Sequence, residues 1–310
     1  MSDSVSIAIV TRRRPLLLAR CLQSIEQLNH KPDIVLIIDN DALAQTKPIA
    51  QQFSNRLPLI YIKESRQGVA YARNAALRQV TTSLLGFIDD DCVLDRNWVT
   101  QGLQSVSLPR VSYVVGRSLL FNQKSVLAQA KHIHQTYWFF QKLRAHNVIP
   151  TPFNFDTKNM LLRVADFKKA RVRFDPSFTI GAIDSSDTDM GFQVAAAGLV
   201  GVYNKNLIVA HEEVEQFAPF FSKAFARGRM AYRLATKWQT RNEFVDEQHR
   251  SWMTYAKSVR FWRQEFHQYM DKAPLSLPKK IVAFFLIKLY ERAYLAGYFH
   301  EKKLETRRYV

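Results

Sequence analysis

One stretch of this chain runs from an apolar segment directly into three acidic residues. Leu84–Ile88 is apolar, and Asp89, Asp90 and Asp91 follow it without interruption. A short apolar run bounded by polar residues is typical of a strand that is buried on both faces, as in a parallel sheet. The three carboxylates would then lie at the carboxyl end of that strand, which is where open α/β sheets bind ligands.

Three adjacent carboxylates repel one another, so a bound cation or hydrogen-bond donors must offset their charge. Mg²⁺ and Mn²⁺ prefer oxygen ligands, and one or two carboxylates often hold such an ion together with substrate phosphates. A solvated acidic turn that caps the next helix explains the same residues equally well. Residues 89–91 therefore predict either a divalent metal site or a helix cap.

The first hundred residues alternate between apolar strands and helical segments. Strands are predicted at Val5–Val10, Ile34–Ile38 and Leu57–Ile62, before the strand that begins at Leu84. This β-α-β order with short connections predicts an α/β fold with a Rossmann-like, mostly parallel sheet flanked by helices. The chain of 310 residues is long enough for one large α/β domain and an appendage.

The sequence after residue 100 continues this pattern with fewer helices. A further strand is predicted at Val111–Leu120 and a helix at Ser125–Arg144, and the later segments Asn154–Arg163 and Leu207–His211 belong to the same half of the chain. From about residue 216 the sequence becomes basic and aromatic with helical spacing, so we expect a helical C-terminal region over 216–310.

Several common signatures are absent. The two cysteines, Cys21 and Cys92, form no pair or metal-type spacing, which indicates a reducing compartment. No Gly-x-Gly-x-x-Gly follows the first strand and no Gly-rich Lys-Ser/Thr loop occurs, which argues against dinucleotide oxidoreductases and P-loop enzymes. No secretory signal is visible, and the longest uncharged apolar run, Ile281–Ile287, is too short to span a bilayer. We therefore expect a cytoplasmic protein.

The excess of positive charge lies mainly near the C-terminus. The net charge is +17, and residues 221–310 hold 19 Lys and Arg against 8 Asp and Glu. This distribution favours an acidic partner: nucleic acid, anionic lipid or a phosphorylated substrate. A basic surface that only keeps the protein soluble is the alternative.

Four segments in order resemble motifs of the inverting family-2 glycosyltransferases, a GT-A fold family, of the type that builds bacterial cell-surface polysaccharides. Val10–Leu22 resembles the opening Pro-Thr-Tyr-Asn-Arg-Pro segment, and Ile37–Asn40 resembles the Val-Val-Asp-Asp segment that holds the nucleoside. Gly68–Asn74 resembles the Gly-x-x-x-Ala-Arg-Asn turn, and Phe87–Trp98 resembles the Asp-x-Asp segment. The resemblance covers roughly residues 4–235 and implies a catalytic domain over 1–215, with a nucleotide-binding half at 1–100 and an acceptor half at 101–215.

The resemblance implies a nucleotide-diphosphate sugar as donor, with a UDP-sugar favoured, and Mg²⁺ or Mn²⁺ as cofactor. Arg12 stands where the family usually has an aromatic residue, but a guanidinium also stacks on a nucleobase. Asp91 and His211 are the implied metal ligands. The residues implied to bind the nucleotide sugar are Thr11, Arg12, Arg14, Asp39, Gly68, Arg73, Asn74, Asp89 and Asp90.

The resemblance places the catalytic base in the second half of the domain. Gly181–Phe192 resembles the Gly-Glu-Asp-x-Asp-Leu segment, which makes Asp187 the base. Asp184 is the alternative on the acceptor side, because Ser186 replaces the usual Glu, and Asn159 belongs to the strand that returns to the acceptor. The implied reaction transfers a sugar, with inversion, to a hydroxyl of a glycan or lipid-linked acceptor.

The C-terminal region combines aromatic and basic residues. Phe217, Phe221 and Phe225 form one helical stripe, and Ser251–Met270 adds further aromatic and basic residues. Lys279–Phe299 predicts an apolar helix whose polar residues Lys288, Glu291 and Arg292 share a face. Such helices favour peripheral attachment to the inner face of an anionic membrane. They could equally bury against the catalytic domain or, in a homo-oligomer, against a second subunit.

Two other classes of protein share parts of this pattern. A nucleotidyltransferase acting on a sugar phosphate also combines a Rossmann-like sheet, acids and Mg²⁺, but it needs a Gly-rich loop after the first strand, where this chain has Arg12-Arg13-Arg14. A nucleic-acid or membrane binding module would use the basic C-terminal region. Because no RRM signature or zinc spacing occurs, we expect no nucleic-acid partner.

Overall fold

The computed structural model of the protein describes residues 3–142, 156–180, 183–240, 259–271 and 273–306. The chain forms two compact units: the first holds Met1–Phe121 and Lys142–Glu212, and the second holds Asn122–Gln141 and Glu213–Val310. The predicted boundary at residue 215 lies near the last change of unit, but residues 122–141, expected in the acceptor half, belong with the C-terminal helices. Parts of three predicted segments, residues 143–144, 154–155 and 251–258, lie outside the described residues.

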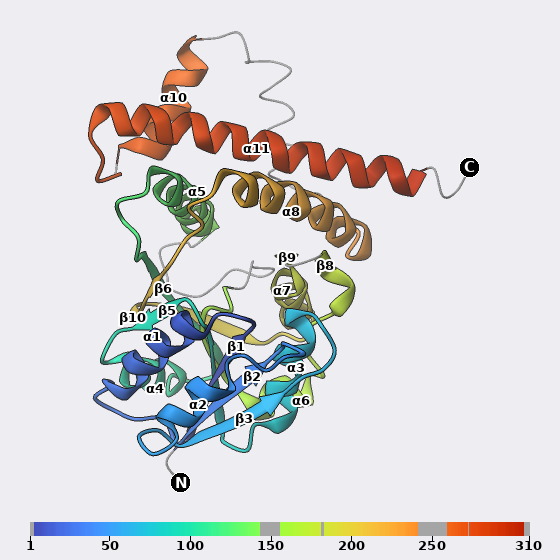
Figure 1. The fold of residues 1–310 in the computed structure, drawn as a ribbon. Helices are drawn as coiled ribbons and strands as arrows, with labels where there is room; N and C mark the ends of the chain where they lie inside the picture. Colours follow the sequence, from blue (N-terminus) through green and yellow to red (C-terminus); the bar gives the residue numbers. More distant parts are fainter. Residues whose placement is uncertain (1–2, 143–155, 181–182, 241–258, 272, 307–310) are drawn as a thin grey trace. The chain divides into compact units, whose positions relative to one another are not determined.

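The first unit is built on one eight-stranded sheet (Figure 1). In spatial order its strands are β3 (Leu59–Lys63), β2 (Ile34–Asp39), β1 (Val5–Thr11), β4 (Leu84–Asp89), β7 (Asn159–Arg163), β6 (Val111–Leu120), β10 (Val200–His211) and β5 (Cys92–Leu94). The first four strands are parallel, β7 runs antiparallel between β4 and β6, and β6 and β10 are parallel to each other. This mixed α/β arrangement confirms the predicted fold class.

The strand register brings the polar strand ends together at one edge of the sheet. Thr11 of β1 pairs with Asp39 of β2, and the neighbouring Val10 pairs with Asp89 of β4. Because β7 is antiparallel to β4, its first residue, Asn159, arrives at the same edge opposite Ile88. The chemistry-bearing residues of distant segments therefore meet here.

The short strand β5 was not predicted from the sequence, and it completes this edge. It pairs antiparallel with β10, with Cys92 opposite His211. His211 is also paired with Leu120 at the end of β6. This register sets Asp91, the residue before β5, beside the last residue of β10.

Helices cover both faces of the sheet (Figure 1). The apolar residues of one face of β1, such as Val5, Ile7 and Ile9, share a core with residues of three helices. These helices are α1 (Pro15–Glu26), α2 (Lys47–Phe53) and α4 (Trp98–Val106). Proline at the start of α1 and of α2 suits the first helical turn, where the missing N–H has no helical partner.

The other face of the sheet carries α3 (Val69–Gln79) and α6 (Val164–Lys169) (Figure 1). Edge-to-face ring contacts join Phe87 to Phe174 and Tyr113 to Phe167 on this side. The chain then forms a short 3₁₀ turn (Pro176–Phe178), the two-stranded β8–β9 pair (Thr179–Ile180 and Ile183–Asp184) and helix α7 (Ser186–Ala196).

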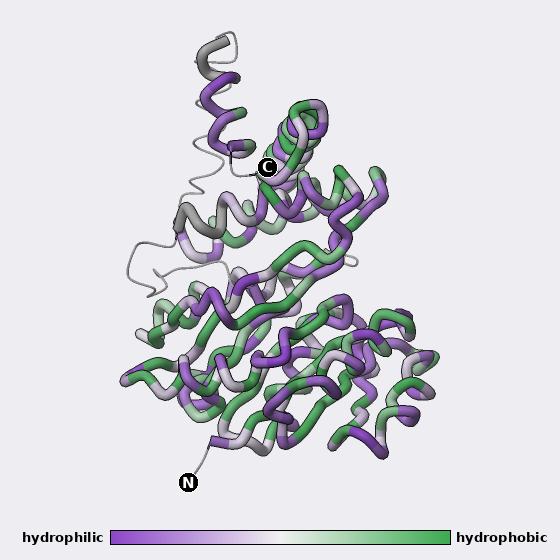
Figure 2. The backbone as a smooth tube through the Cα atoms, turned by 90° about the vertical axis from the view of Figure 1, so that its left-hand side faces the viewer, coloured by the Kyte–Doolittle hydropathy of each residue, from purple (hydrophilic) through white to green (hydrophobic). Residues whose placement is uncertain are grey.

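The second unit is helical, as predicted. Its helices are α5 (Val126–Lys142), α8 (Phe217–Lys237), α10 (Val259–Met270) and α11 (Leu277–Thr306). Figure 2 shows hydrophobic and hydrophilic residues alternating along these helices. Gly228 of α8 faces the Tyr294 carbonyl and Gly297 of α11 faces the Phe225 carbonyl so closely that a Cβ at either glycine would overlap the oxygen. The two glycines thus let the helix backbones touch.

No helix in the described ranges has both the length and the apolar content to cross a membrane.

Candidate active site

The three aspartates follow β4 at the polar edge of the sheet, and their side chains point in different directions. Asp90 is buried, whereas the carboxylates of Asp89 and Asp91 keep some exposure. Helix α4 begins at Trp98 with Asn97 at its N-cap, so these acids do not cap it. The helix-cap alternative for residues 89–91 is therefore excluded.

Asp90 joins the acid turn to the turn that follows β1. Thr11 Oγ1 donates a hydrogen bond of 2.8 Å to its carboxylate, and Arg14 Nη1 lies 3.1 Å from the other oxygen. Burial raises the pKa of Asp90 to about 7; Arg14 opposes this shift, while Asp91 and Asp89 add to it. The Asp90 carboxylate faces protein groups, so its contribution to a donor site is to hold Thr11 and Arg14 in place.

Asp91 lies between a guanidinium and an imidazole. One of its oxygens is 3.1 Å from Arg14 Nη1, and the other is 3.3 Å from His211 Nε2. The backbone also joins the two segments, since the Glu212 N–H donates to the Asp91 carbonyl at 3.1 Å. The pairing of β5 with β10 thus fixes the Asp91–His211 contact.

The donor atoms of this pair fit two positions of a divalent metal shell. Among the described residues, no group of three or more His, Cys, Asp or Glu side chains is placed to hold a metal ion. Neighbouring ligands of an octahedral Mg²⁺ or Mn²⁺ ion lie about 3 Å apart, close to the 3.3 Å between Asp91 and His211. Such ions commonly take their remaining ligands from water and substrate phosphates, so two protein ligands are enough.

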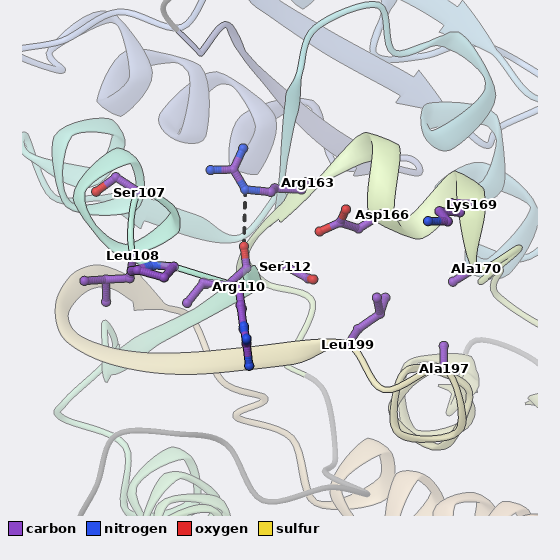
Figure 3. A pocket seen from close by; sticks show the side chains of 12 residues that line it. Ser107, Leu108, Arg110, Ser112, Arg163, Asp166, Lys169, Ala170, Ala197 and Leu199 are labelled. Atoms are coloured by element: carbon purple, nitrogen blue, oxygen red, sulfur yellow. Dashed lines mark hydrogen bonds between the residues drawn. The ribbon is translucent and has the colours of Figure 1, made fainter.

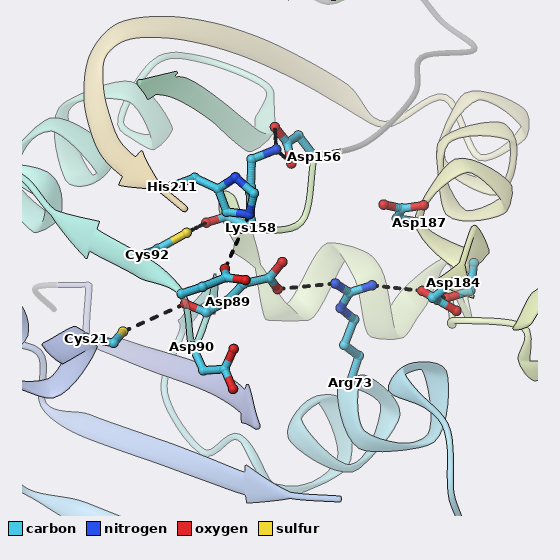
Figure 4. A network of polar contacts seen from close by, with 12 residues as sticks. Cys21, Arg73, Asp89, Asp90, Cys92, Asp156, Lys158, Asp184, Asp187 and His211 are labelled. Atoms are coloured by element: carbon cyan, nitrogen blue, oxygen red, sulfur yellow. Dashed lines mark hydrogen bonds and ion pairs between the residues drawn. The ribbon is translucent and has the colours of Figure 1, made fainter. Parts of the chain in front are cut away.

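Arg73 of α3 bridges two acids from distant segments (Figure 4). Its Nη1 lies 2.9 Å from Asp184 and its Nη2 lies 3.3 Å from Asp89. Burial alone would lower the pKa of Arg73, but the two carboxylates outweigh it and raise the pKa. The guanidinium therefore stays charged and ties the acid turn to β9.

The two candidate bases differ in their surroundings. The Asp184 carboxylate is largely buried and accepts hydrogen bonds from Arg73, from Thr179 Oγ1 at 2.9 Å and from Ser186 Oγ at 2.7 Å. Asp187 lies in the first turn of α7, is only partly buried, and accepts from the N–H of Thr188 at 2.7 Å. Figure 4 shows it on the Asp184 side of the network, with His211 and Lys158 on the other side. The Asp184 carboxylate is thus the more buried of the two and is held by three side-chain donors.

Lys158 and Asp156 are site residues that the sequence reasoning did not assign. Lys158 Nζ lies 2.6 Å from Asp156, and its carbonyl accepts a weak contact of 3.8 Å from the Cys92 thiol. Figure 4 shows the Lys158 side chain beside His211. The one available signal was position: Lys158 immediately precedes β7, which pairs with β4 directly before the three aspartates.

Asp39, predicted to bind the nucleoside, turns its carboxylate into the protein. It is fully buried and accepts hydrogen bonds from Tyr61 at 2.6 Å, from the N–H of Asp41 at 2.9 Å and from the Thr46 hydroxyl. Burial and the Asp39 charge raise the pKa of Tyr61. A direct ribose contact would require these bonds to change. Arg12, the predicted base-stacking residue, is exposed in the turn after β1.

Gly68 shapes the turn between β3 and α3. Its φ of 134° lies in a region that only glycine adopts readily. Its N–H donates 2.8 Å to Asn40 Oδ1, and the Asn40 amide in turn donates to the carbonyls of Glu64 and Arg66. Asn40 thus fixes the loop that precedes the Arg73 helix.

Two asparagines predicted to contact substrate bind the protein backbone instead. The Asn74 amide makes both hydrogen bonds to Phe174, at 2.7 and 3.0 Å. Asn159 is fully buried, accepts from Trp98 Nε1 at 2.8 Å and donates to the carbonyls of Arg117 and Leu207. The Asn159 amide joins β7 to β6 and β10, and the acceptor contact stays a prediction for this residue.

A pocket of about 860 Å³ lies elsewhere in the first unit (Figure 3). It is formed where β6 and β10 begin, whereas His211 and Leu120 lie where these parallel strands end. The pocket is consequently at the opposite edge of the sheet from the aspartates. Its lining residues are Ser107, Leu108, Pro109, Arg110, Val111, Ser112, Arg163, Asp166, Lys169, Ala170, Ala197 and Leu199.

Solved structures share this fold at low sequence identity. A mannosyltransferase from Pyrobaculum calidifontis, in complex with GDP-Man and Mn²⁺, matches with a TM-score of 0.63 and 15% identity over 97% of this chain and 87% of that one. The S. aureus TarS fragment 1–349 in complex with UDP-GlcNAc matches with a TM-score of 0.58 and 11% identity over 97% and 92% of the two chains. These matches confirm the GT-A fold.

Curated relatives match over shorter segments. The glycosyltransferase AglE of Haloferax volcanii is 36% identical over 84 residues, which are 26% of this chain and 28% of AglE. The succinoglycan biosynthesis protein ExoM of Rhizobium meliloti is 27% identical over 117 residues, 36% of this chain and 38% of ExoM. The alignments thus span between about a quarter and two fifths of these relatives.

A family model gives the broadest sequence match. The model described as "Glycosyl transferase family 2" matches residues 6–171. This range includes the three aspartates and Arg73 but ends before Asp187 and His211. Because the match covers more than half of the chain, the protein belongs to glycosyl transferase family 2.

Proposed function

We propose that the protein is a metal-assisted, inverting glycosyltransferase that moves a sugar from a nucleotide-diphosphate sugar to a hydroxyl group. One observation carries the proposal: His211, which pairs with Asp91, and Asp187 lie on opposite sides of one cluster of polar side chains, and Arg73 pairs with Asp89 and Asp184 between them (Figure 4). A metal-bound leaving group and a base for the incoming hydroxyl are the two parts that such a reaction needs.

The donor half of the site would use the turn after β1 and the acid turn. Arg12 and Arg14 are exposed or half-exposed cations there, suited to a base or to phosphate oxygens. Asp89 keeps about a third of its side chain exposed and is oriented by Arg73. A UDP-sugar is the favoured donor, and the UDP-GlcNAc complex of TarS supports this choice. Because the Pyrobaculum enzyme is in complex with GDP-Man, GDP-sugars are also tested as donors.

Asp91 and His211 would hold Mg²⁺ or Mn²⁺ with their facing oxygen and nitrogen atoms. When bound, the ion would act as a Lewis acid that neutralises the charge of the departing diphosphate. The Mn²⁺ in the Pyrobaculum mannosyltransferase complex supports Mn²⁺ as the first ion to test. Arg14, whose guanidinium is half-exposed beside Asp91, would add a fixed positive charge on the same side.

Asp187 would act as the base. Its carboxylate takes the proton from the acceptor hydroxyl while that oxygen forms a bond to the anomeric carbon. The bond between the anomeric carbon and the diphosphate oxygen breaks on the opposite face, and its electrons leave with the nucleotide diphosphate. One displacement of this kind inverts the configuration. Asp184, held by three donors, keeps Arg73 and the start of α7 in place.

The acceptor would be a glycan or a lipid-linked glycan, and the protein would work in the cytoplasm at the inner face of the cell membrane. The names of the curated relatives support polysaccharide synthesis as the setting, since ExoM is a succinoglycan biosynthesis protein. A homo-oligomer is compatible with this role.

A thermal-shift panel tests the donor and metal assignments together. UDP-, GDP- and dTDP-sugars are each added with and without Mn²⁺, and one nucleotide class is expected to raise Tm further when Mn²⁺ is present. Asp91→Ala should remove the Mn²⁺-dependent part of the shift. Asp95→Asn is the matched control, because Asp95 is an exposed acid four residues later in the same segment. If no nucleotide sugar stabilises the wild-type protein, the proposed function is wrong.

A further inference from the structure

Helix α11 exposes a run of large apolar side chains. Leu277, Ile281, Val282, Phe285 and Leu289 are between 43% and 63% exposed, and Phe299 further along is 39% exposed. Ile281, Phe285 and Leu289 recur every four residues, so they lie on one side of the helix. We call the side that carries these six residues the α11 outer face. An exposed apolar surface of this kind often marks a site that binds another protein or a membrane.

The same helix also carries two buried charged residues. Lys288 and Glu291 are 7% and 2% exposed, and their side chains pair at 2.6 Å. Lys288 also pairs with Glu265 of α10 at 2.9 Å, and Tyr269 donates 2.7 Å to Glu291. A surface helix in water normally turns its charges outward and its apolar residues inward. Over this stretch α11 is apolar on both sides: Ala283, Phe284 and Ile287 are buried in the core of the unit, while the α11 outer face is apolar and exposed. This pattern suits a helix with an apolar medium on its outside.

The charges that remain outside on α11 are mainly positive. Lys279 and Arg292 are exposed beside the apolar run, and Lys302 and Lys303 are exposed near the end of the helix. Of the three acids of α11, Glu291 is buried, Glu301 is buried with Arg229 and Arg233 at 2.6 Å, and Glu305 is partly buried. Apolar side chains flanked by Lys and Arg are complementary to a bilayer surface that carries anionic headgroups.

We propose that the α11 outer face docks on the surface of an anionic lipid bilayer. Phe285 and Leu289 would enter the boundary between headgroups and acyl chains, and Lys279 and Arg292 would reach the phosphates. The helix lies on the membrane and does not cross it, in agreement with the absence of a spanning helix among the described residues. This deepens the proposed function by naming the lipid class and the surface, but it does not depend on the donor site.

A second copy of this chain is the competing occupant, and charge disfavours it. A two-fold interface through the α11 outer face would bring the same surface of both subunits together. The basic residues of the two helices would then share a buried interface without acids from either outer face, and like charges in an interface are destabilising. The oligomeric state is therefore measured beside lipid binding.

Flotation of the full-length protein with vesicles tests the proposal. Phosphatidylcholine vesicles with about a third phosphatidylglycerol should carry the protein upward, whereas pure phosphatidylcholine vesicles should carry much less, and added salt should release it. The double variant Phe285→Gln/Leu289→Gln should lose binding by about ten-fold or more. Lys279→Glu/Arg292→Glu should weaken binding to the anionic vesicles alone.

Leu43→Gln/Leu108→Gln is the matched control, because both leucines are more than half exposed on the first unit. This control should float like the wild type, and Tm and the nucleotide-dependent thermal shift should be unchanged in every variant. Equal flotation of the wild type and the Phe285/Leu289 variant would overturn the proposal. So would conversion of a wild-type dimer to a monomer by that variant with flotation unchanged, which would assign the face to a second copy. If nucleotides cause no thermal shift but the wild type still floats with anionic vesicles, the proposed donor site is wrong and the membrane proposal stands.

Discussion

Arg14 Nη1 lies 3.1 Å from a carboxylate oxygen of Asp91, so a protein cation contacts the carboxylate that is proposed to bind the metal. The Arg14 side chain is 48% exposed and also pairs with Asp90 at 3.1 Å. A metal at Asp91 therefore competes with a guanidinium for the same negative charge. Because Asp90 also holds Arg14, the guanidinium would stay beside the metal and could bind the diphosphate of the donor.

The variant Arg14→Gln tests this competition. Without nucleotide it should bind Mn²⁺ up to about five-fold more tightly than the wild type, since a partly exposed ion pair contributes up to about 1 kcal/mol. With nucleotide diphosphate present it should bind the nucleotide more weakly, because a phosphate-binding cation is gone. Titration calorimetry with Mn²⁺ alone and then with UDP measures both effects.

Arg13→Gln is the control for Arg14→Gln. Arg13 is equally exposed and pairs with Asp41 at 2.8 Å, away from Asp91. Its removal should leave Mn²⁺ affinity unchanged. Equal Mn²⁺ affinity in the wild type and Arg14→Gln would show that the two cations do not compete.

The contacts of Asp184 predict a loss of stability when its charge is removed. Asp184→Asn leaves Arg73, which is buried, with one carboxylate partner fewer. Breaking a buried ion pair from one side costs about 3 kcal/mol, whereas Asp187→Asn should change the free energy of unfolding little. Chemical denaturation of both variants measures the difference. Equal stabilities of the two variants would contradict the proposal that Asp184 supports the structure of the site while Asp187 acts as the base.

Glu64 predicts a pH dependence of stability. Hydrogen bonds from Arg66 lower the pKa of Glu64 from 4.5 to about 2, although its burial acts in the opposite direction. A carboxyl group whose pKa is depressed by folding stabilises the native state above its unfolded pKa and loses this contribution as pH falls through the folded value. The wild type should therefore exceed Glu64→Gln in stability at pH 7, and the difference should shrink between pH 4.5 and pH 2.

Arg66→Gln should reproduce most of the stability that Glu64→Gln loses, because the Arg66 guanidinium donates two hydrogen bonds to the Glu64 carboxylate. Unfolding free energies of the three proteins across this pH range check the prediction. A constant difference between wild type and Glu64→Gln over the whole range would contradict it.

The contact between α8 and α11 predicts a strong effect of one methyl group. Gly228→Ala would place a Cβ against the Tyr294 carbonyl, and neither backbone can rotate away as a side chain would. Overpacking of this kind costs about 1–3 kcal/mol. Thermal unfolding should show the loss, while Ser222→Ala on the exposed side of α8 should leave Tm nearly unchanged.

Much of the fold could be predicted because local sequence and tertiary structure agree. The strand at Val111–Leu120 has the predicted bounds, and the run from Leu84 into three acids is a central strand with an acid turn. The three-residue β5 carries too little pattern to be seen alone. Helix α5 lies within the predicted segment Ser125–Arg144, but the order of elements does not reveal that residues 122–141 pack with the C-terminal helices.

The site was harder to predict than the fold, because a residue type does not state where its side chain points. Asp39 and Asn159 lie at the predicted edge, yet their side chains are fully buried. The sequence places both residues at this edge but does not show that Tyr61 and Trp98 form hydrogen bonds with their side chains. Lys158 has no motif of its own and becomes visible only through the pairing of β7 with β4.

Helix α11 shows the same limit on a larger scale. The apolar pattern and the shared face of Lys288 and Glu291 were visible in the sequence. Which face is buried depends on partners such as Glu265 and Tyr269, which accept and donate to these charges from another helix. Periodicity gives the faces of a helix, and packing decides which one meets solvent or lipid.

The central claim is that Asp187 is the base of a sugar transfer whose donor is held elsewhere in the site. The most direct test measures UDP release from the UDP-sugar that gives the largest thermal shift, with a lipid and glycan extract as acceptor, for the wild type and Asp187→Asn. The account predicts a rate lower by about 10²–10⁴-fold in the variant, with UDP and Mn²⁺ affinity essentially unchanged. A variant that keeps its rate, or that loses nucleotide affinity in parallel with rate, would contradict it.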